Sequence, residues 1–350
     1  MGRPPEAEET SPATGGRKRR LLGIAVVVVV YAVGLAFTNL RDGLEALREA
    51  IWWPLALAFL LEALTVATLA QVHRSSAAAV RGRIRNREAL NVSMSAFTVS
   101  QTVPGGGAVA GALIVSRLQR FGLSAPQATA SMVLTASLAT VTIALIAAGG
   151  IVPEVLDAEL PGIALAGVAA LVVVLVGVVA AVVAVLRSPR LADRLLERAG
   201  RLHDVVARRV DDWRESLRVV HDDPPTLARL LRIVAWSLVN WSADIAALGM
   251  VFLAFGAPVS LTVLLVGFGV SQVGAAVPLT PGGVGFVESG MVAAFVALGT
   301  PVSLATTVVV AYRVLATWLP ALAGTYMLVQ PVGDAPDGDD REGPVRRADR

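Results

Sequence analysis

Six apolar runs, each long enough to cross a lipid bilayer, set the strongest limit on what this chain can fold into. A transmembrane helix needs about 20 mostly apolar residues to cross a hydrocarbon core of about 30 Å. The runs cover residues 21–40, 51–70, 127–149, 161–186, 230–255 and 301–330. With 55% hydrophobic and only 16% charged residues, the chain is too apolar for a soluble domain of this size. We therefore predict an all-α polytopic membrane protein with about six transmembrane helices.

The first run follows four basic residues at positions 17–20, as the apolar region of a signal peptide does. That region is only about 7–15 residues long and precedes a cleavage site of small residues. We therefore interpret residues 21–40 as an uncleaved first helix. The polar segments 1–20 and 331–350 are expected to be disordered cytoplasmic tails that flank one membrane domain, residues 21–330.

The distribution of arginine between loops predicts the orientation, because positively charged residues near helix ends stay in the cytoplasm. The stretch 71–90 carries five arginines and the stretch 187–229 carries ten, whereas the loop 151–160 carries no Lys or Arg. The loop 41–50 carries two arginines. We therefore place the first two stretches inside, and both termini in the cytoplasm of a bacterium with this protein in its inner membrane.

The polar insert 187–229 repeats apolar residues at spacings near three to four, which indicates an amphipathic helix. Such a helix would lie on the inner leaflet, where its arginines meet anionic head groups. A plain connector between two transmembrane helices is the alternative.

Two glycine-rich breaks interrupt apolar segments that do not fit as ordinary spans. The segment 91–116 contains Pro104-Gly105-Gly106-Gly107, and both of its ends lie inside in the predicted orientation. Its arms of about 13 and 9 residues are too short to cross the bilayer, so we predict a re-entrant hairpin. The segment 258–300, broken at Pro278 and Pro281-Gly282-Gly283, predicts a second hairpin, with two full spans as the alternative.

The two halves of the chain repeat one plan in opposite orientation. Val99-Ser100-Gln101 precedes the first break, and Val270-Ser271-Gln272 precedes the second. Leu123-Ser124-Ala125-Pro126 follows the first hairpin where Leu298-Gly299-Thr300-Pro301 follows the second. These matches predict an inverted-topology repeat, in which a helix, a broken hairpin and a helix occur twice.

A backbone that is broken inside the membrane must be buried in protein or line a wet cavity, because hydrocarbon cannot satisfy its polar groups. The half-helix after each break would direct free N–H groups and a positive dipole end inward, which suits a phosphate. A helix kink without a ligand is the alternative. The predicted lipid-binding residues are Gln101, Pro104, Gly105, Gly106, Gly107, Arg117, Gln272, Pro281, Gly282, Gly283, Gly285, Glu288 and Arg313.

Ionisable side chains inside the apolar runs strengthen this prediction, because each costs at least about 2.5 kcal/mol at the bilayer centre. We expect Glu288 and Arg313 to face one cavity, where Arg313 or Arg117 attracts a lipid phosphate. Glu288 would pair with the cation or take a proton, and a structural ion pair is the alternative. Glu62 and Asp244 are a second candidate pair, for coupling or for structure.

The residue types argue against several other function classes. Cysteine is absent, and His73, His203 and His221 lack the spacing of metal ligands. We find no Ser-His-Asp set, HExxH or P-loop motif, and no basic face with interleaved aromatic residues. We therefore expect no enzyme activity, no metal, no cofactor and no nucleic acid, and membrane lipids as partners.

The string Pro281-Gly282-Gly283-Val284-Gly285-Phe286-Val287-Glu288 resembles the signature of the lysylphosphatidylglycerol synthase transmembrane-region family. The first break, residues 103–108 leading to Ser116-Arg117, is similar to an earlier motif of that family. The resemblance runs over most of residues 20–330. It implies a flippase-like membrane domain, which in the full-length synthases translocates aminoacylated phosphatidylglycerol.

Two departures from the family pattern limit what the resemblance implies. The chain ends at Arg350 after the membrane region, so we expect no aminoacyl-transferase domain and no lysine transfer. Gly106 and Val109-Ala110 stand where many forms of the first motif carry an Arg and a Glu. We predict a protein that translocates or binds an anionic phospholipid, with the lipid and any homo-oligomer left open. The alternatives are a non-transporting module that binds lipid or a partner enzyme, and an enzyme acting on lipid phosphate.

Overall fold

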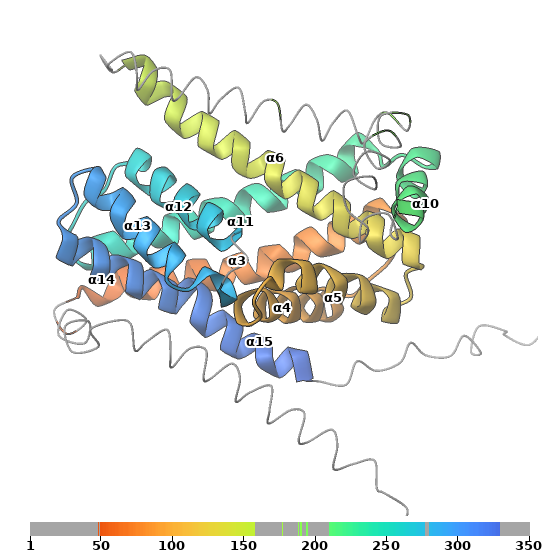
Figure 1. The fold of residues 1–350 in the computed structure, drawn as a ribbon, viewed down its shortest axis with the longest axis horizontal. Coiled ribbons are helices and arrows are strands. Elements are labelled where there is room, and N and C mark those ends of the chain that lie inside the picture. Colours follow the sequence, from red (N-terminus) through yellow and green to blue (C-terminus); the bar gives the residue numbers. More distant parts are fainter. Residues whose placement is uncertain are drawn as a thin grey trace, which may run out of the picture.

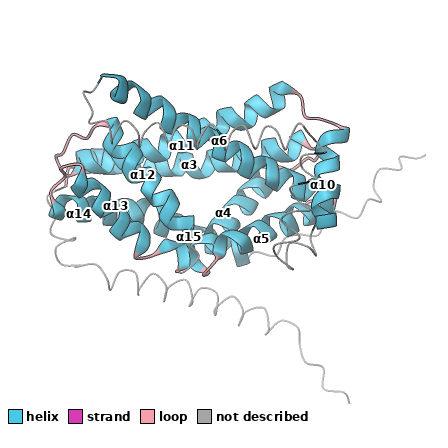
Figure 2. Cartoon of the chain, turned by 45° about the horizontal axis from the view of Figure 1, so that its top comes forward, coloured by secondary structure: helices cyan, strands magenta, loops and turns pink. Residues whose placement is uncertain are grey.

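The computed structural model describes residues 50–157, 210–276 and 280–329, together with Arg48, Gly177, Ser188, Arg190 and Arg194. The predicted helices 21–40 and 161–186, both tails and most of the insert between 187 and 209 lie outside the described residues. The described part is all helical and contains no strand (Figure 2). It confirms the prediction of an all-α membrane protein.

The helices follow the predicted order along the chain (Figure 1). They are α3 (Trp52–Ala79), α4 (Asn86–Thr102), α5 (Gly106–Arg120), α6 (Ala125–Asp157), α10 (Val210–Asp222), α11 (Leu227–Ala254), α12 (Leu261–Ala276), the 3₁₀ turn η1 (Pro281–Gly283), α13 (Phe286–Ala297), α14 (Val302–Arg313), the π-helical turn η2 (Val314–Trp318) and α15 (Leu319–Val329). Four stretches are long and apolar enough to cross a membrane: Trp52–Ala79, Ala125–Ile146, Leu227–Ala254 and Val302–Leu328.

Helix α3 extends nine residues beyond its apolar run of residues 51–70 and takes in part of the arginine-rich stretch 71–90. The polar side chains of His73, Ser75 and Ser76 in this extension are buried. His73 Nδ1 lies 2.9 Å from Ser93 Oγ on α4, which gives the ring a partner inside the protein. Packing against neighbouring helices therefore continues α3 where hydropathy alone predicts a loop.

Each glycine break joins two adjacent helices that are too short to span a bilayer alone. The helices α4 and α5 pack side by side and contain 17 and 15 residues. Both are longer than the predicted arms, and α4 begins at Asn86, where Glu88 accepts from the Arg85 N–H at 2.7 Å. The second pair, α12 and α13, contains 16 and 12 residues. At 1.5 Å per residue these four helices measure about 18–26 Å.

The two halves of the described chain are interlocked. Helix α3 of the first half packs along α11 of the second half in the middle of the structure (Figure 1). Each hairpin also contacts the last helix of the other half. Helix α4 of the first hairpin packs on α15, and α12 of the second hairpin packs on α6. The contacts are therefore reciprocal between the halves.

Helix α10, the described part of the polar insert, packs its apolar side against protein. It contacts α6, and its Val219 and Val220 join the core formed with α3, α5 and α11. Ser216 on the same side is buried, whereas Glu215 and Arg218 are exposed. Helix α10 is amphipathic, and its apolar side is covered by neighbouring helices.

The contact between α4 and α15 depends on Gly324, and we predict that Gly324→Ala destabilises the protein by about 1–3 kcal/mol. A Cβ atom at Gly324 would lie 2.6 Å from the Met94 carbonyl oxygen and would also meet Thr98 Oγ1. The change would push apart helices that are joined by the hydrogen bond from Thr98 Oγ1 to the Ala321 carbonyl at 3.0 Å. Small residues allow this close approach of membrane helices.

Unfolding of the detergent-solubilised protein, followed by circular dichroism, measures this effect. Gly269→Ala is the matched control, because nothing lies within 4 Å of a Cβ atom built on this glycine of α12. Equal stability of the two variants would contradict the proposed role of Gly324.

Candidate functional site

The second glycine turn packs against the end of α4, a few residues before the first glycine turn. The 3₁₀ turn η1 contacts α4, and Gly282 lies against Gln101. A Cβ atom at Gly282 would lie 2.8 Å from the backbone oxygen and 2.6 Å from the side-chain oxygen of Gln101. Gly282 also has a positive φ of 58°, which favours glycine. Residues from the two predicted hairpins therefore share one site.

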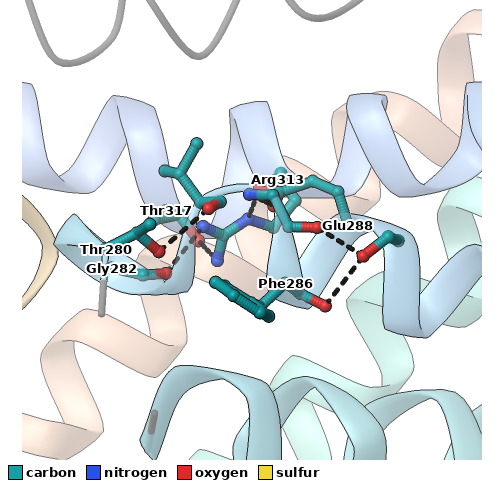
Figure 3. A network of polar contacts seen from close by, with 9 residues as sticks. Thr280, Gly282, Phe286, Glu288, Arg313 and Thr317 are labelled. Carbon is teal, nitrogen blue, oxygen red and sulfur yellow. Dashed lines mark hydrogen bonds and ion pairs between the residues drawn. The ribbon is translucent and has the colours of Figure 1, made fainter. Parts of the chain in front are cut away.

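Arg313 connects the second turn to the last transmembrane helix. It is the final residue of α14, immediately before the π-helical turn η2, and its side chain is buried. Its Nε donates to Glu288 Oε1 at 2.8 Å, and its Nη2 donates to the Gly282 carbonyl oxygen at 3.1 Å (Figure 3). Its Nη1 donates to Thr317 Oγ1 at 3.0 Å. The guanidinium group thus holds η1, α13 and η2 together.

Glu288 does two tasks at the start of α13. The Gly285 N–H donates to Glu288 Oε2 at 2.7 Å, while the other carboxylate oxygen binds Arg313. The carboxylate therefore occupies the position at this helix N-terminus where we expected a lipid phosphate. The sequence predicted that Glu288 and Arg313 face one cavity, with a structural ion pair as the alternative, and the structure joins the two side chains as an ion pair.

The start of α5 also follows a Pro-Gly turn, but it has no such carboxylate. Gly105, the residue before α5, has a φ of 65°, and no side chain forms a cap at the start of this helix. Ala108 takes the third helical position, which Glu288 takes in α13. Gly107 and Ala108 are exposed, and nothing lies within 4 Å of a Cβ atom built on Gly107. Of its first three N–H groups, those of Gly106 and Ala108 donate to the Val103 and Gly105 carbonyls at 2.9 and 3.2 Å. The exposed N–H of Gly107 has no such partner among the described residues, so it is the group that can take an external acceptor.

The remaining predicted turn residues have structural surroundings. Gly106 is buried, and a Cβ atom there would lie 2.6 Å from the carbonyl oxygens of Val99 and Ser100. Gln101 Oε1 is buried without a hydrogen-bond partner among the described residues, whereas Gln272 is half-buried on α12. Pro104 is exposed and precedes Gly105 as Pro281 precedes Gly282. Gly283 is buried against Gly274, with a φ of 68°.

Arg117 is not part of this junction. It lies eleven residues into α5, about 16 Å from the turn along the helix axis. Its buried guanidinium donates to the Leu328 carbonyl at 3.0 Å and also binds Met327 O and Asn91 Oδ1. Arg117 therefore caps the C-terminus of α15, where a cation is favourable.

Glu62 and Asp244 come together at the interface of α3 with α11, and Tyr312 joins them. Tyr312 Oη donates to Asp244 Oδ1 at 2.5 Å, and the two carboxyl groups interact directly. Glu62 Oε1 is buried without a hydrogen-bond partner among the described residues and borders a cavity of about 30 Å³. Apart from Glu62 and Thr65, the side chains that line this cavity are apolar. Sequence reasoning missed Tyr312, which is the residue before Arg313 in the apolar run.

A second missed signal supports the match between the halves. Phe97 and Phe268 precede the two Val-Ser-Gln strings at the same spacing. Ser100 Oγ donates to the Phe97 carbonyl at 2.7 Å, and Ser271 Oγ donates to the Phe268 carbonyl at 2.6 Å. The matched strings therefore have the same local hydrogen bond as well as the same letters.

Comparisons with known proteins agree with this architecture. Residues 20–324 match the family model described as the lysylphosphatidylglycerol synthase TM region. A UPF0104 membrane protein of Pyrococcus horikoshii is 33% identical over 103 residues, which cover 29% of this chain and 30% of that protein. A UPF0104 membrane protein of Methanothermobacter thermautotrophicus is 30% identical over 88 residues, which cover 25% of this chain and 26% of that protein. The match to the family model extends over most of the sequence, so this chain belongs to the lysylphosphatidylglycerol synthase transmembrane-region family.

Proposed function

We propose that this protein translocates an anionic phospholipid between leaflets and binds its phosphate near the two glycine turns. The observation that carries the proposal is the exposed start of α5, which follows Gln101 by five residues, while Gln101 lies against Gly282, whose carbonyl binds the buried Arg313. Free N–H groups at a helix start bind phosphate, and a guanidinium binds it through paired donors. Arg313 keeps two N–H groups beyond its three described bonds.

In this proposal both hairpins are re-entrant and form an inverted repeat. The short helices of each hairpin support re-entrance, because each is shorter than the bilayer core of about 30 Å. The reciprocal contacts of α4 with α15 and of α12 with α6 support the repeat. Alternating access would then arise from rocking of one half against the other around a site near the midplane.

The ion pair explains how an empty site stays stable. Without lipid, Glu288 neutralises Arg313 and caps α13. When a lipid phosphate binds at α5, the remaining Arg313 donors provide a second anchor. Arg313 and Glu288 therefore never become unpaired charges inside the membrane, where an unpaired charge is costly.

The cluster of Glu62, Asp244 and Tyr312 is the proposed coupling element. Its members belong to both halves, since Glu62 lies on α3 and the other two lie on α11 and α14. Two neighbouring carboxyl groups in a dry site cannot both be charged without a large penalty, so they share a proton. Gain or loss of that proton would change how α3 packs on α11 and how Tyr312 binds Asp244.

We test this proposal with leaflet exchange of fluorescent phosphatidylglycerol and phosphatidylcholine in liposomes that contain the purified protein. The decisive variant is Ala108→Glu, which would place a carboxylate at the third position of α5 as Glu288 stands in α13. We expect it to slow phosphatidylglycerol exchange about tenfold or more, because the new carboxylate would occupy the N-terminus and repel phosphate.

Ala108→Gln is the matched control, because it adds similar bulk without charge and should keep near-normal exchange. Wild-type exchange at the rate of empty liposomes for both lipids would favour a non-transporting module that binds lipid or a partner. Equal exchange by wild type and Ala108→Glu would exclude the start of α5 as the phosphate site.

A further inference from the structure

A basic cavity lies between the end of α3 and the start of α11, away from the glycine turns. Its volume is about 400 Å³, and its lining residues are Ser75, Ala78, Gly82 and the four arginines Arg81, Arg83, Arg229 and Arg232. No acidic residue is among them. In the predicted orientation this end of the bundle faces the cytoplasm.

Only one of the four arginines has an ion-pair partner among the described residues. Arg81 Nε and Nη2 donate to the two carboxylate oxygens of Asp223 at 2.6 and 2.8 Å. These hydrogen bonds, followed by the charges of Arg81 and Arg229, hold the pKa of Asp223 below its ordinary value. Arg229 Nη1 is buried without a hydrogen-bond partner in the described part of the chain. A buried guanidinium nitrogen without an acceptor is costly, so an anion that accepts from Arg229 would be stabilised here.

Arg81 stands at a backbone position that favours glycine. It has a φ of 64°, and it is the one described residue other than glycine with a positive φ. The bonds from Arg81 N to the Ala78 carbonyl and from Gly82 N to the Ala77 carbonyl form a Schellman cap at the end of α3. A strained backbone at a residue other than glycine points to a function of its side chain.

We infer that this cavity binds a phosphate group that carries two negative charges, as in a phosphomonoester or a diphosphate. Arg83, Arg229 and Arg232 form no ion pair among the described residues, and guanidinium groups match phosphate geometry with paired hydrogen bonds. The Thr226 side chain forms no cap at the start of α11, and the Arg229 N–H donates to the Thr226 carbonyl at 2.9 Å, so the N–H groups of Leu227 and Ala228 add positive potential. The phosphate belongs either to a lipid head group or to a soluble molecule.

The site shares no residue with the proposed lipid pathway, so each proposal can fail without the other. The test measures binding of inorganic pyrophosphate to the purified full chain by calorimetry. A second arm measures binding to nanodiscs of phosphatidylcholine with and without phosphatidic acid. We expect Arg229→Gln and Arg232→Gln each to weaken binding about tenfold or more.

Two further variants keep the test specific. Arg87→Gln removes an exposed arginine of α4 that does not line the cavity, and it should bind like wild type. Arg81→Gly removes the backbone strain, so it should unfold at the same or a higher temperature while it binds more weakly. Binding of pyrophosphate alone assigns a soluble ligand, and binding of the phosphatidic acid nanodiscs alone assigns a head group. No binding of either probe, or equal losses in Arg87→Gln and Arg229→Gln, would overturn the inference.

Discussion

Arg313→Ala is expected to lower the free energy of unfolding by about 3–5 kcal/mol, because it leaves the charge of Glu288 without its partner in a largely buried site. The same change removes the donor to the Gly282 carbonyl and thereby loosens η1 from the last transmembrane helix. Denaturant titration of the protein in detergent micelles, followed by circular dichroism, measures the loss.

Two further variants separate structure from function at this ion pair. Glu288→Gln keeps an oxygen that accepts from the Gly285 N–H, so α13 remains capped. The double variant Arg313→Met with Glu288→Gln removes both charges and should recover much of the stability lost in Arg313→Ala. If the pair serves only the fold, the double variant also regains lipid exchange; if Arg313 binds phosphate, the variant folds and stays inactive. A loss below about 1 kcal/mol in Arg313→Ala would contradict the structural role.

The positions of the helix breaks could be predicted because their signals are local. Proline and glycine determine the backbone at Pro104-Gly105 and Pro281-Gly282 regardless of what packs nearby, and the structure breaks its helices there. Long apolar runs predict spans for the same reason, because composition and length alone decide whether a helix can cross a bilayer. The four long helices of the described part all correspond to predicted spans.

Partners that are distant in sequence could not be predicted in the same way. Arg117 was expected to bind phosphate, but its carbonyl partners lie more than 200 residues away at the end of α15. Tyr312 is a partner of Asp244 only because α11 packs against α14 in the fold, which the sequence does not show. Hydropathy also ended α3 too early, because it does not register that Ser75 and Ser76 are buried by neighbouring helices.

The difference between the two helix starts needed both kinds of information. The sequence gives the identities of Ala108 and Glu288, but only the starting residues of α5 and α13 show that the two occupy the same position in their helices. With Gly105 and Gly285 as the residues before each helix, both side chains take the third helical position. Only then does one N-terminus contain its own carboxylate and the other remain open.

Gly282→Ala is expected to destabilise the protein by about 2–4 kcal/mol and to abolish lipid exchange. An alanine pays about 1–2 kcal/mol for the left-handed backbone at this position, where φ is 58°. Its Cβ atom would also lie 2.8 Å from the Gln101 backbone oxygen, and overpacking of this kind costs about 1–3 kcal/mol. The second turn would then move away from α4, and the hydrogen bond from Arg313 to the Gly282 carbonyl would break.

Gly107→Ala provides the matched comparison in the first turn. Gly107 has no positive φ, and a Cβ atom at this position would have nothing within 4 Å, so alanine should keep or raise stability by about 0.5–1 kcal/mol. It also retains the N–H that the proposed phosphate site needs. Thermal unfolding in detergent measures the stability of both variants, and the liposome assay measures their lipid exchange. If the two variants behave alike, the contact between Gly282 and Gln101 neither stabilises the fold nor contributes to lipid exchange. If only Gly282→Ala loses stability and exchange, both properties depend on the close approach that this glycine allows.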